Sequence, residues 1–335
     1  MPTLPIDNGL LVNPEMARIF EEDTRIQRML DVEAALAWAH AEVGNIPQKD
    51  AGKIAAMASL EHVKLNRVKE VELDTKHDIV ALVRVLAETC GASGAYVHLG
   101  ATSSDITDTA TALQLKDALD LIVAKLLDLR ETLEVKASEI PINTCFYSPE
   151  VSASGLTSWF HEISRHTQRL LECKKRVLVG KMSGAVGTQS AFGPHAARIQ
   201  KLVMKRLGIE AAEISTQILQ RDRHGELVCL LAGVAATLEK IAIAFELEEL
   251  KMKNVNGVGL SWQDMSPQGT SGDRDLISSL GKMVRSLVVP ALENMLTKHE
   301  QDLTQSSSER FIIPQACILV DYMLFIANDV TKKSK

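Results

Sequence analysis

Two heptad patterns of apolar residues constrain the fold more than any other feature of this sequence. In each pattern, apolar residues recur at alternating steps of four and three. Such spacing places them on one face of a long helix that packs almost parallel to its neighbours. Neither helix can hide that face from water by itself, so the patterns predict an extended all-α bundle completed by other helices or other subunits. The two sets are Leu115, Leu119, Ile122, Leu126, Leu129 and Leu133, then Leu227, Leu231, Val234, Leu238, Ile241 and Phe245.

The rest of the chain also favours helices. Aromatic residues make up only 4% of the sequence, and the alternation typical of strands is nearly absent. We expect an N-terminal helical domain over residues 1–104 and a long-helix bundle over 105–335. Residues 254–274 contain four glycines and Pro267, which predicts a long loop, either a mobile element of a site or a solvated linker. Further helices are predicted at 14–43, 74–90, 155–178, 193–207, 275–296 and 309–330.

Composition excludes several classes of protein. The net charge is −6 and no Lys/Arg cluster stands out, so nucleic-acid binding is not expected, although a few placed cations could hold a small anion. No uninterrupted apolar run reaches the roughly 18 residues of a membrane span, and no signal peptide follows Met1. We therefore expect a cytoplasmic protein without membrane contact. The cysteines show no metal-ligand or CxxC spacing, which predicts buried free thiols: Cys90, Cys145, Cys173, Cys229 and Cys317.

A polar, glycine-containing segment from Tyr96 to Asp105 stands directly before the first heptad helix. Its hydroxyls and the free N–H groups of the helix start are suited to a carboxylate or a phosphate. The alternative is simple capping, with Ser104 or Asp105 as the N-cap. Capping needs only one of these residues, however, and it does not explain His98.

Two further segments have a similar composition. Lys181–Gln189 is a turn of small residues before a helix. His299–Arg310 places one arginine and several hydroxyls before the last predicted helix. For this second segment the alternative is again an N-cap, at Ser307 or Ser308. Each segment alone is weak evidence for a site.

Taken in order, these segments resemble the adenylosuccinate lyase family of the fumarase/aspartase superfamily. The resemblance covers nearly all of the chain. Its further motifs are Pro14-Glu15-Met16, Val32-Glu33-Ala34, Thr75-Lys76-His77-Asp78, Ser215-Thr216-Gln217 and Arg221-Asp222-Arg223-His224.

The resemblance implies a fold, an activity and an assembly. The family is helical, and its central helices form a tetrameric core in which three subunits build each active site. It cleaves a C–N bond by β-elimination, releasing fumarate from adenylosuccinate and from a related imidazole-carboxamide intermediate of purine synthesis. For this chain the implied partners are a small anionic substrate and further copies of itself, in a homotetramer. No cofactor is implied.

The resemblance also implies site residues. For catalysis these are His77, which would contact substrate and support the acid, His98 as a further active-site histidine, and Ser266 in the loop that supplies the family's serine base. No metal ligand is predicted. The implied substrate-binding residues comprise hydroxyls for a carboxylate, an amide, and groups for phosphate or nucleotide: Lys76, Asp78, Thr102, Ser103, Gln217, Ser306 and Arg310.

Several family motifs are altered. The family's general-acid histidine lies in an Arg-Thr-His-Gly-Gln stretch, but residues 141–150 contain no histidine, and His161 and His166 on the next helix are predicted to lie on its surface. The loop around Ser266 lacks the family's Lys and Asn. The family's Arg-Tyr is Leu10-Leu11 here, and the arginine of its His-Glu-Arg-Asp is Gln301. Because the sequence ends at residue 335, the family's C-terminal domain is expected to be absent.

Three interpretations remain open. The chain is an active lyase of this family, or a catalytically silent paralogue that acts as a helical assembly partner. The third is another lyase of the superfamily, of the argininosuccinate or cycloisomerase type. The residue sequences of the motifs Thr102–Asp105 and Ser306–Arg310 favour the adenylosuccinate lyase family over this last alternative.

Overall fold

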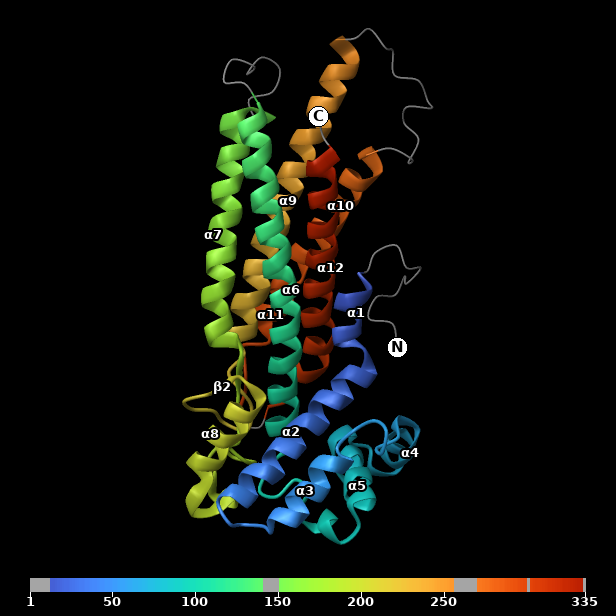
Figure 1. Ribbon diagram of the computed structural model, residues 1–335, viewed down its shortest axis with the longest axis vertical. Coiled ribbons are helices and arrows are strands. Elements are labelled where there is room, and N and C mark those ends of the chain that lie inside the picture. The colour runs from blue at the N-terminus through green and yellow to red at the C-terminus, as the bar shows by residue number, and fades with distance from the viewer. Residues whose placement is uncertain (1–12, 141–150, 256–269, 300–301, 334–335) are drawn as a thin grey trace.

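The computed structural model describes residues 13–140, 151–255, 270–299 and 302–333. In these residues the chain is almost entirely helical, which confirms the predicted all-α class. A bundle of long helices forms most of the length of the molecule, and a smaller group of helices lies at one end of it (Figure 1).

The bundle is built from the helices that carry the heptad patterns and from the helices that cover them. Every residue of the first pattern is fully buried, and every residue of the second is at most 5% exposed. Both patterns therefore face the core, as predicted. The bundle helices are α6 (Ser103–Glu139), α7 (Ala153–Val177), α9 (Asp222–Val255), α10 (Thr270–Ser286), α11 (Val288–Glu293) and α12 (Gln305–Lys333).

The smaller group begins with α2 and has its own hydrophobic core. The short helix α1 (Pro14–Phe20) is not part of this core, because its Met16 packs into the bundle. Two-residue strands β1 (Val179–Gly180) and β2 (Glu210–Ala211) pair in parallel. The helices of the group are α2 (Glu22–Glu42), α3 (Gln48–Met57), α4 (Leu65–Thr75), α5 (Asp78–Cys90), η1 (Gly91–Tyr96), η3 (Ser190–His195) and α8 (Ala196–Leu207).

The two hydrophobic cores are interleaved along the chain. Ile106 and Leu113 of α6 pack into the core of the smaller group, whereas the same helix from Leu115 onward packs into the bundle core. After α7 the chain leaves the bundle, and Met182 and Ile209 pack into the core of the smaller group. The predicted domain limits, 1–104 and 105–335, stay predictions.

Several predicted helix limits are wrong. The helix predicted at 14–43 is interrupted at Glu21, whose backbone is extended (φ −62°, ψ 152°). At this break the Thr24 hydroxyl donates to the carbonyl oxygen of Arg18 (2.6 Å), which satisfies the end of α1. The last helix begins at Gln305 rather than 309 and tolerates Pro314 within it. The predicted loop 254–274 loses residues 254–255 to α9 and 270–274 to α10, and residues 256–269 lie outside the described residues.

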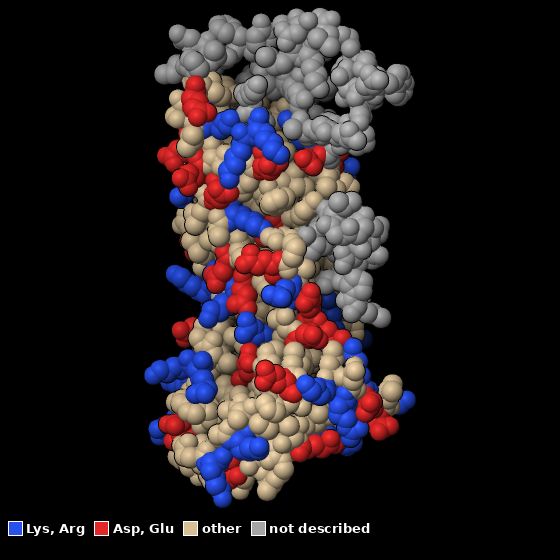
Figure 2. Space-filling view, turned by 45° about the vertical axis from the view of Figure 1, so that its right-hand side comes forward, with Lys and Arg blue, Asp and Glu red and all other residues tan. Residues whose placement is uncertain are grey.

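Two composition-based expectations need qualification. Cys90, Cys173 and Cys317 are buried as predicted, but Cys229 lies exposed on α9, and Cys145 is outside the described residues. By length and mean hydropathy, α5 with η1, α9 and α12 are each apolar enough to cross a membrane, although 61% of the α9 window and 72% of the α12 window are buried inside the fold. On one face of the molecule Lys and Arg side chains are interspersed with Asp and Glu side chains (Figure 2).

Candidate functional site

Three bundle helices begin at the end of the bundle that faces the smaller helical group. These are α6, α9 and α12 (Figure 1). The polar segments Tyr96–Asp105 and His299–Arg310 lead into α6 and α12, whereas Lys181–Gln189 leads into η3. The first turn of a helix has N–H groups without partners inside the helix, and the helix dipole makes this end positive. Helix starts gathered at one place are therefore suited to an anionic ligand.

The start of α6 is capped by Thr102, not by Ser104 or Asp105 as predicted from the sequence. Asp105 lies in the first turn and accepts a hydrogen bond from the backbone N–H of Thr102 (3.0 Å). This pairing of the cap with the third helical residue satisfies a donor that the helix itself leaves free. Thr102 and Ser103 are both half-buried.

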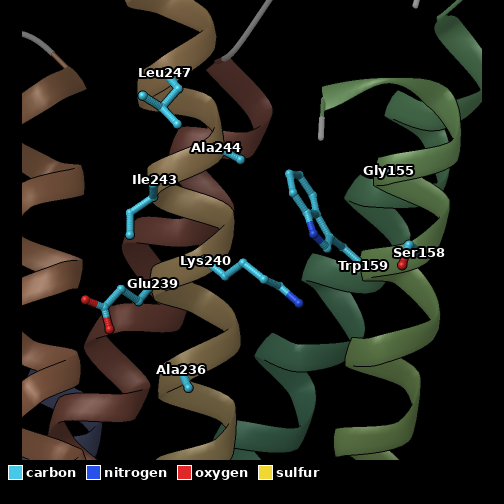
Figure 3. A pocket seen from close by; sticks show the side chains of 9 residues that line it. All are labelled: Gly155, Ser158, Trp159, Ala236, Glu239, Lys240, Ile243, Ala244 and Leu247. Carbon is cyan, nitrogen blue, oxygen red and sulfur yellow. The ribbon is translucent and has the colours of Figure 1, made fainter. Parts of the chain in front are cut away.

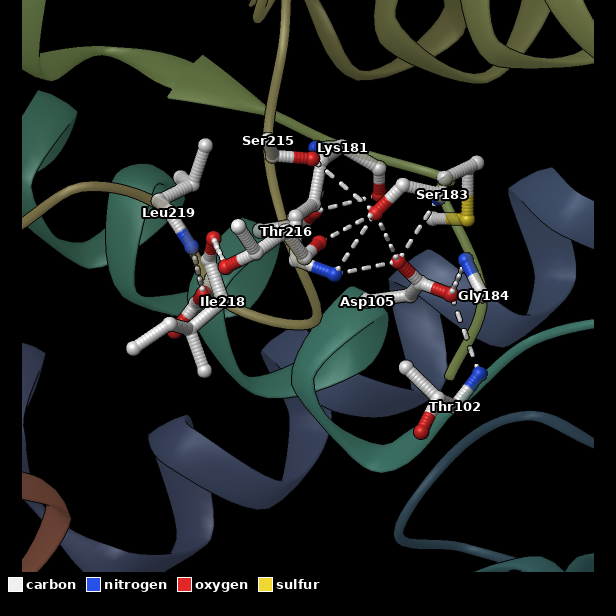
Figure 4. Close-up of polar contacts among 12 residues, drawn as sticks. Thr102, Asp105, Lys181, Ser183, Gly184, Ser215, Thr216, Ile218 and Leu219 are labelled. Carbon is white, nitrogen blue, oxygen red and sulfur yellow. Dashed lines mark hydrogen bonds and ion pairs between the residues drawn. The ribbon is translucent and has the colours of Figure 1, made fainter. Parts of the chain in front are cut away.

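A buried ion pair ties the second polar segment to this helix start. Lys181 and Asp105 are both fully buried, and Nζ of Lys181 lies 2.6 Å from Oδ1 of Asp105 (Figure 4). The same carboxylate accepts from the backbone N–H groups of Ser183 (2.9 Å) and Gly184 (3.0 Å). Both carboxylate oxygens are therefore used, and the turn after Lys181 is fixed against α6. Charge-assisted hydrogen bonds of this kind are the strong ones.

The network continues to the segment that contains Gln217. The Ser183 hydroxyl donates to the carbonyl oxygen of Thr216 (3.1 Å), and the Ser215 hydroxyl donates to Ser183 (3.0 Å) (Figure 4). Gln217 is half-buried beside these residues in the chain. Hydrogen bonds through Asp105 and Ser183 thus link the segments of Thr102 and Gln217 in one network, and the substrate-binding roles of these two residues stay predictions.

A second network starts one turn further along α6. Arg221 pairs with Asp108 (Nη2 to Oδ1, 2.9 Å) and with Glu309 of α12 (Nε to Oε2, 3.1 Å). His224 contacts the other oxygen of Glu309 (2.9 Å). Burial raises the pKa of the Asp108 carboxyl, but the Arg221 guanidinium outweighs it and holds that pKa below its ordinary value. The pairs connect the starts of α6, α9 and α12.

Arg310 lies next to Glu309 and reaches the smaller helical group. Its Nη2 lies 2.8 Å from Oδ2 of Asp78 at the start of α5, and Arg25 approaches the same oxygen at 3.7 Å. Burial raises the pKa of Asp78, yet the two guanidinium groups outweigh it and lower that pKa. About half of the Arg310 side chain is exposed, so this arginine remains open to a ligand.

Two further predicted residues, Lys76 and His77, lie between α4 and α5 and directly precede Asp78. His77 is the N-cap, and its Nδ1 accepts from the backbone N–H of Val80 (3.4 Å). Lys76 is exposed and has a left-handed backbone conformation (φ 54°). The structure therefore gives His77 a capping role, and its half-exposed ring is also open to solvent.

His98 is held by a residue that the sequence analysis did not assign to the site. Glu33 of α2 lies 2.6 Å from Nδ1 of His98. The sequence offers one signal for this contact, a glutamate within the apolar run from Val32 to Ala37. A charged side chain in such a run is buried, as Glu33 is, only when it has a partner.

Four further residues named in the sequence analysis have separate outcomes. Ser306 is half-buried in the first turn of α12, and its backbone N–H donates to Leu303. Ser266 lies outside the described residues. His161 is exposed as predicted, but the prediction for His166 is wrong: it is buried and its Nε2 lies 2.9 Å from the Thr237 hydroxyl of α9.

A polar cavity of about 480 Å³ opens beside the networks. Its walls include Thr216, Arg221, Lys298 and His299, whereas Gln217 is not among the lining residues. A larger cavity of about 610 Å³ lies between α7 and α9 and is lined by Trp159, Lys240 and apolar side chains (Figure 3). None of the predicted site residues lines this second cavity. Among the described residues no group of three His, Cys, Asp or Glu side chains is placed to hold a metal ion.

Comparison with known proteins places the chain in a family. A family model described as lyase matches residues 11–144 and 148–247. The adenylosuccinate lyase of Pyrococcus abyssi is 43% identical over 95% of this chain and 73% of the relative. That of Bacillus subtilis is 33% identical over 95% and 75%. The chain belongs to the adenylosuccinate lyase family.

Solved structures of two other enzymes share this fold. The 3-carboxy-cis,cis-muconate lactonizing enzyme of Pseudomonas putida matches 97% of this chain and 76% of its own with a TM-score of 0.85 and 28% identity. A fumarate lyase of Mesorhizobium sp. BNC1 matches 98% and 77% with a TM-score of 0.83 and 25% identity. The resemblance read from the polar motifs is thereby confirmed at the level of family and fold.

Proposed function

We propose that this chain is an adenylosuccinate lyase, which releases fumarate from adenylosuccinate and from the related imidazole-carboxamide intermediate by β-elimination. The observation that carries the proposal is the gathering of the family's polar motifs at one end of the bundle, in a protein 33–43% identical to relatives of that name. A cytoplasmic location belongs to the same proposal, because these relatives are metabolic enzymes.

The chemistry requires anion binding and proton transfer. β-Elimination removes a weakly acidic proton next to a carboxylate, so a base is needed and the developing charge must be stabilised. In our proposal the hydroxyls of Thr102 and Ser103 hold a substrate carboxylate at the start of α6. Gln217 supplies an amide to the substrate, and Ser266 acts as the base. No metal and no organic cofactor takes part.

The nucleotide end of the substrate would lie at the other cluster. The half-exposed guanidinium of Arg310 is suited to a phosphate, because arginine binds such groups with two parallel hydrogen bonds. Ser306 is one turn away on the same helix. Asp78 at the start of α5 pairs with Arg310, and Lys76 and His77 directly precede Asp78 in the chain.

We propose further that the chain forms a homo-oligomer, specifically a tetramer. Long bundle helices support this, since Ile243 and Leu247 of α9 are exposed apolar residues on a helix whose other face is buried. Because family active sites combine several subunits, neighbouring copies would complete the site.

One observation favours a second candidate, a catalytically silent paralogue that serves as an assembly partner. Residues 141–150 contain no histidine where the family has its general acid, and Gln301 stands where the family has an arginine. This candidate keeps nucleotide binding through Arg310 but lacks turnover.

A turnover assay separates the two candidates. Purified protein is mixed with adenylosuccinate, and ultraviolet absorbance is followed as AMP and fumarate form. We expect turnover. Absence of any change at high protein concentration, together with AMP binding by calorimetry, would reject the lyase and support the silent paralogue. Absence of both leaves an assembly role, which co-purification with an active homologue tests.

A further inference from the structure

His98 is anchored by a carboxylate that is completely buried. The Glu33 side chain is 0% exposed, and it meets His98 with both of its oxygens. Oε1 lies 2.6 Å from Nδ1 of the ring, and Oε2 accepts from the backbone N–H of the same histidine (3.1 Å). One glutamate therefore fixes both the main chain and the ring of His98. Burial of an ionised carboxylate is costly unless such partners are present.

The backbone of His98 needs this support. Its φ of 62° is in the left-handed region, which a non-glycine residue adopts at a cost of about 1 kcal/mol. A second residue of α2 holds the same loop: Nε2 of His40 lies 2.9 Å from the carbonyl oxygen of Leu99. Glu33 and His40 are two helical turns apart and are each only 1% exposed. Two residues on one face of α2 therefore hold the loop before α6 by hydrogen bonds.

This anchoring determines which edge of the imidazole is available. The two ring nitrogens point in different directions, so a ring whose Nδ1 contacts Glu33 turns Nε2 away from this carboxylate. Among the described residues Nε2 of His98 has no hydrogen-bond partner, and 19% of the side chain is exposed. The free edge can therefore meet a ligand.

The surroundings also favour the charged form of the ring. Burial lowers the pKa of His98, but Glu33 outweighs it, and Asp105 of α6 raises that pKa further. Glu33 and Asp105 are the charged groups that act on His98 from the two helices beside it. An imidazolium donates from both nitrogens, so Nε2–H becomes a charged donor for an anion.

We propose that Glu33 is a positioning residue of the lyase site, which holds His98 so that its Nε2–H donates to an anionic group of the substrate. The statement rests on the proposed function and adds a residue to it. Glu33 itself does not touch substrate, because its carboxylate is completely buried behind His98. Its effect on binding passes through the orientation and charge of the ring.

Histidine titration by NMR tests the electrostatic half of the proposal. In the wild-type protein the pKa of His98 should lie above the ordinary value of about 6.5. In Glu33→Gln it should fall below that value, because burial, the largest influence on this pKa, is then opposed only by Asp105. Glu70→Gln, at an exposed glutamate of α4, is the matched control and should leave it unchanged. A wild-type His98 that titrates below about 6.5 overturns the proposal, even if the Glu33 variant does not fold.

Nucleotide binding tests the functional half. AMP affinity is measured by calorimetry for Glu33→Gln, His98→Asn and the double variant. Each single variant should bind about tenfold more weakly, the loss expected for one charge-assisted hydrogen bond, and the double variant should show no further loss. Additive losses, or an unchanged Glu33→Gln, overturn the positioning role. If Glu33→Gln turns over adenylosuccinate normally, the positioning role of Glu33 is rejected and the lyase activity stands. If the wild type shows no turnover but the two variants lose AMP affinity non-additively, the lyase activity is rejected and the positioning role of Glu33 stands.

Discussion

Replacement of Lys181 by methionine would remove one partner of the buried pair that joins the second polar segment to α6. Both side chains of the pair are 0% exposed, and their charged atoms are 2.6 Å apart. Removing one partner of a buried pair costs about 3–5 kcal/mol, because the other charge stays buried. Asp105 keeps the backbone N–H groups of Thr102, Ser183 and Gly184, so we expect the lower end, about 3 kcal/mol.

Urea unfolding followed by far-ultraviolet circular dichroism measures this loss, at equal protein concentration for both proteins. Lys332→Met is the matched control, because the Lys332–Asp128 pair is about half exposed at 3.1 Å and should contribute less than about 1 kcal/mol. A Lys181→Met protein as stable as this control would refute the view that the buried pair holds the site together.

Three further predictions concern single residues. Arg310→Ala should abolish AMP binding in calorimetry while the thermal unfolding midpoint stays within a few degrees, since the Arg310 side chain is half exposed and Asp78 keeps Arg25 nearby. Unchanged AMP affinity would remove Arg310 from the site. Leu231→Ala, at a fully buried heptad position, should cost about 2–5 kcal/mol in urea unfolding; a loss below about 1 kcal/mol would contradict the packing. Backbone N–H groups of Lys298 and Thr304 lower the pKa of Asp302 to about 2 in the folded protein. Asp302 therefore contributes its full share of stability above the pKa that it has in the unfolded chain, and this contribution is lost as the pH falls toward about 2. The urea midpoints of wild type and Asp302→Asn should therefore converge on acidification, and a constant difference would argue against this assignment.

The long helices could be predicted because their signal is local. Leu115 to Leu133 repeat with a spacing that only a helix places on one face, and packing against any partner buries that face. The residues at which helices begin were harder to predict from the sequence. Ser104 and Asp105 are good caps by residue type, but Thr102 is the cap. The Asp105 carboxylate accepts a hydrogen bond from the Thr102 backbone N–H and also forms an ion pair with Lys181.

The contacts that build the site could not be derived from local patterns. Asp105 and Lys181 are 76 residues apart, and Asp78 and Arg310 are 232 residues apart. Nothing in the neighbouring sequence specifies these pairs, so the resemblance to a family supplied which segments belong together. His166 shows the opposite error: a histidine between charged residues suggests a surface, whereas Thr237 of α9 provides a buried partner.

The helix α6 crosses from one core to the other without interruption, with Leu113 in the first and Leu115 in the second. A continuous helix resists bending, and the chain crosses the same boundary again when Met182 returns after α7. Hinge closure of the two bodies around a substrate would require this rod to break. Unfolding of either core should therefore propagate to the other through α6.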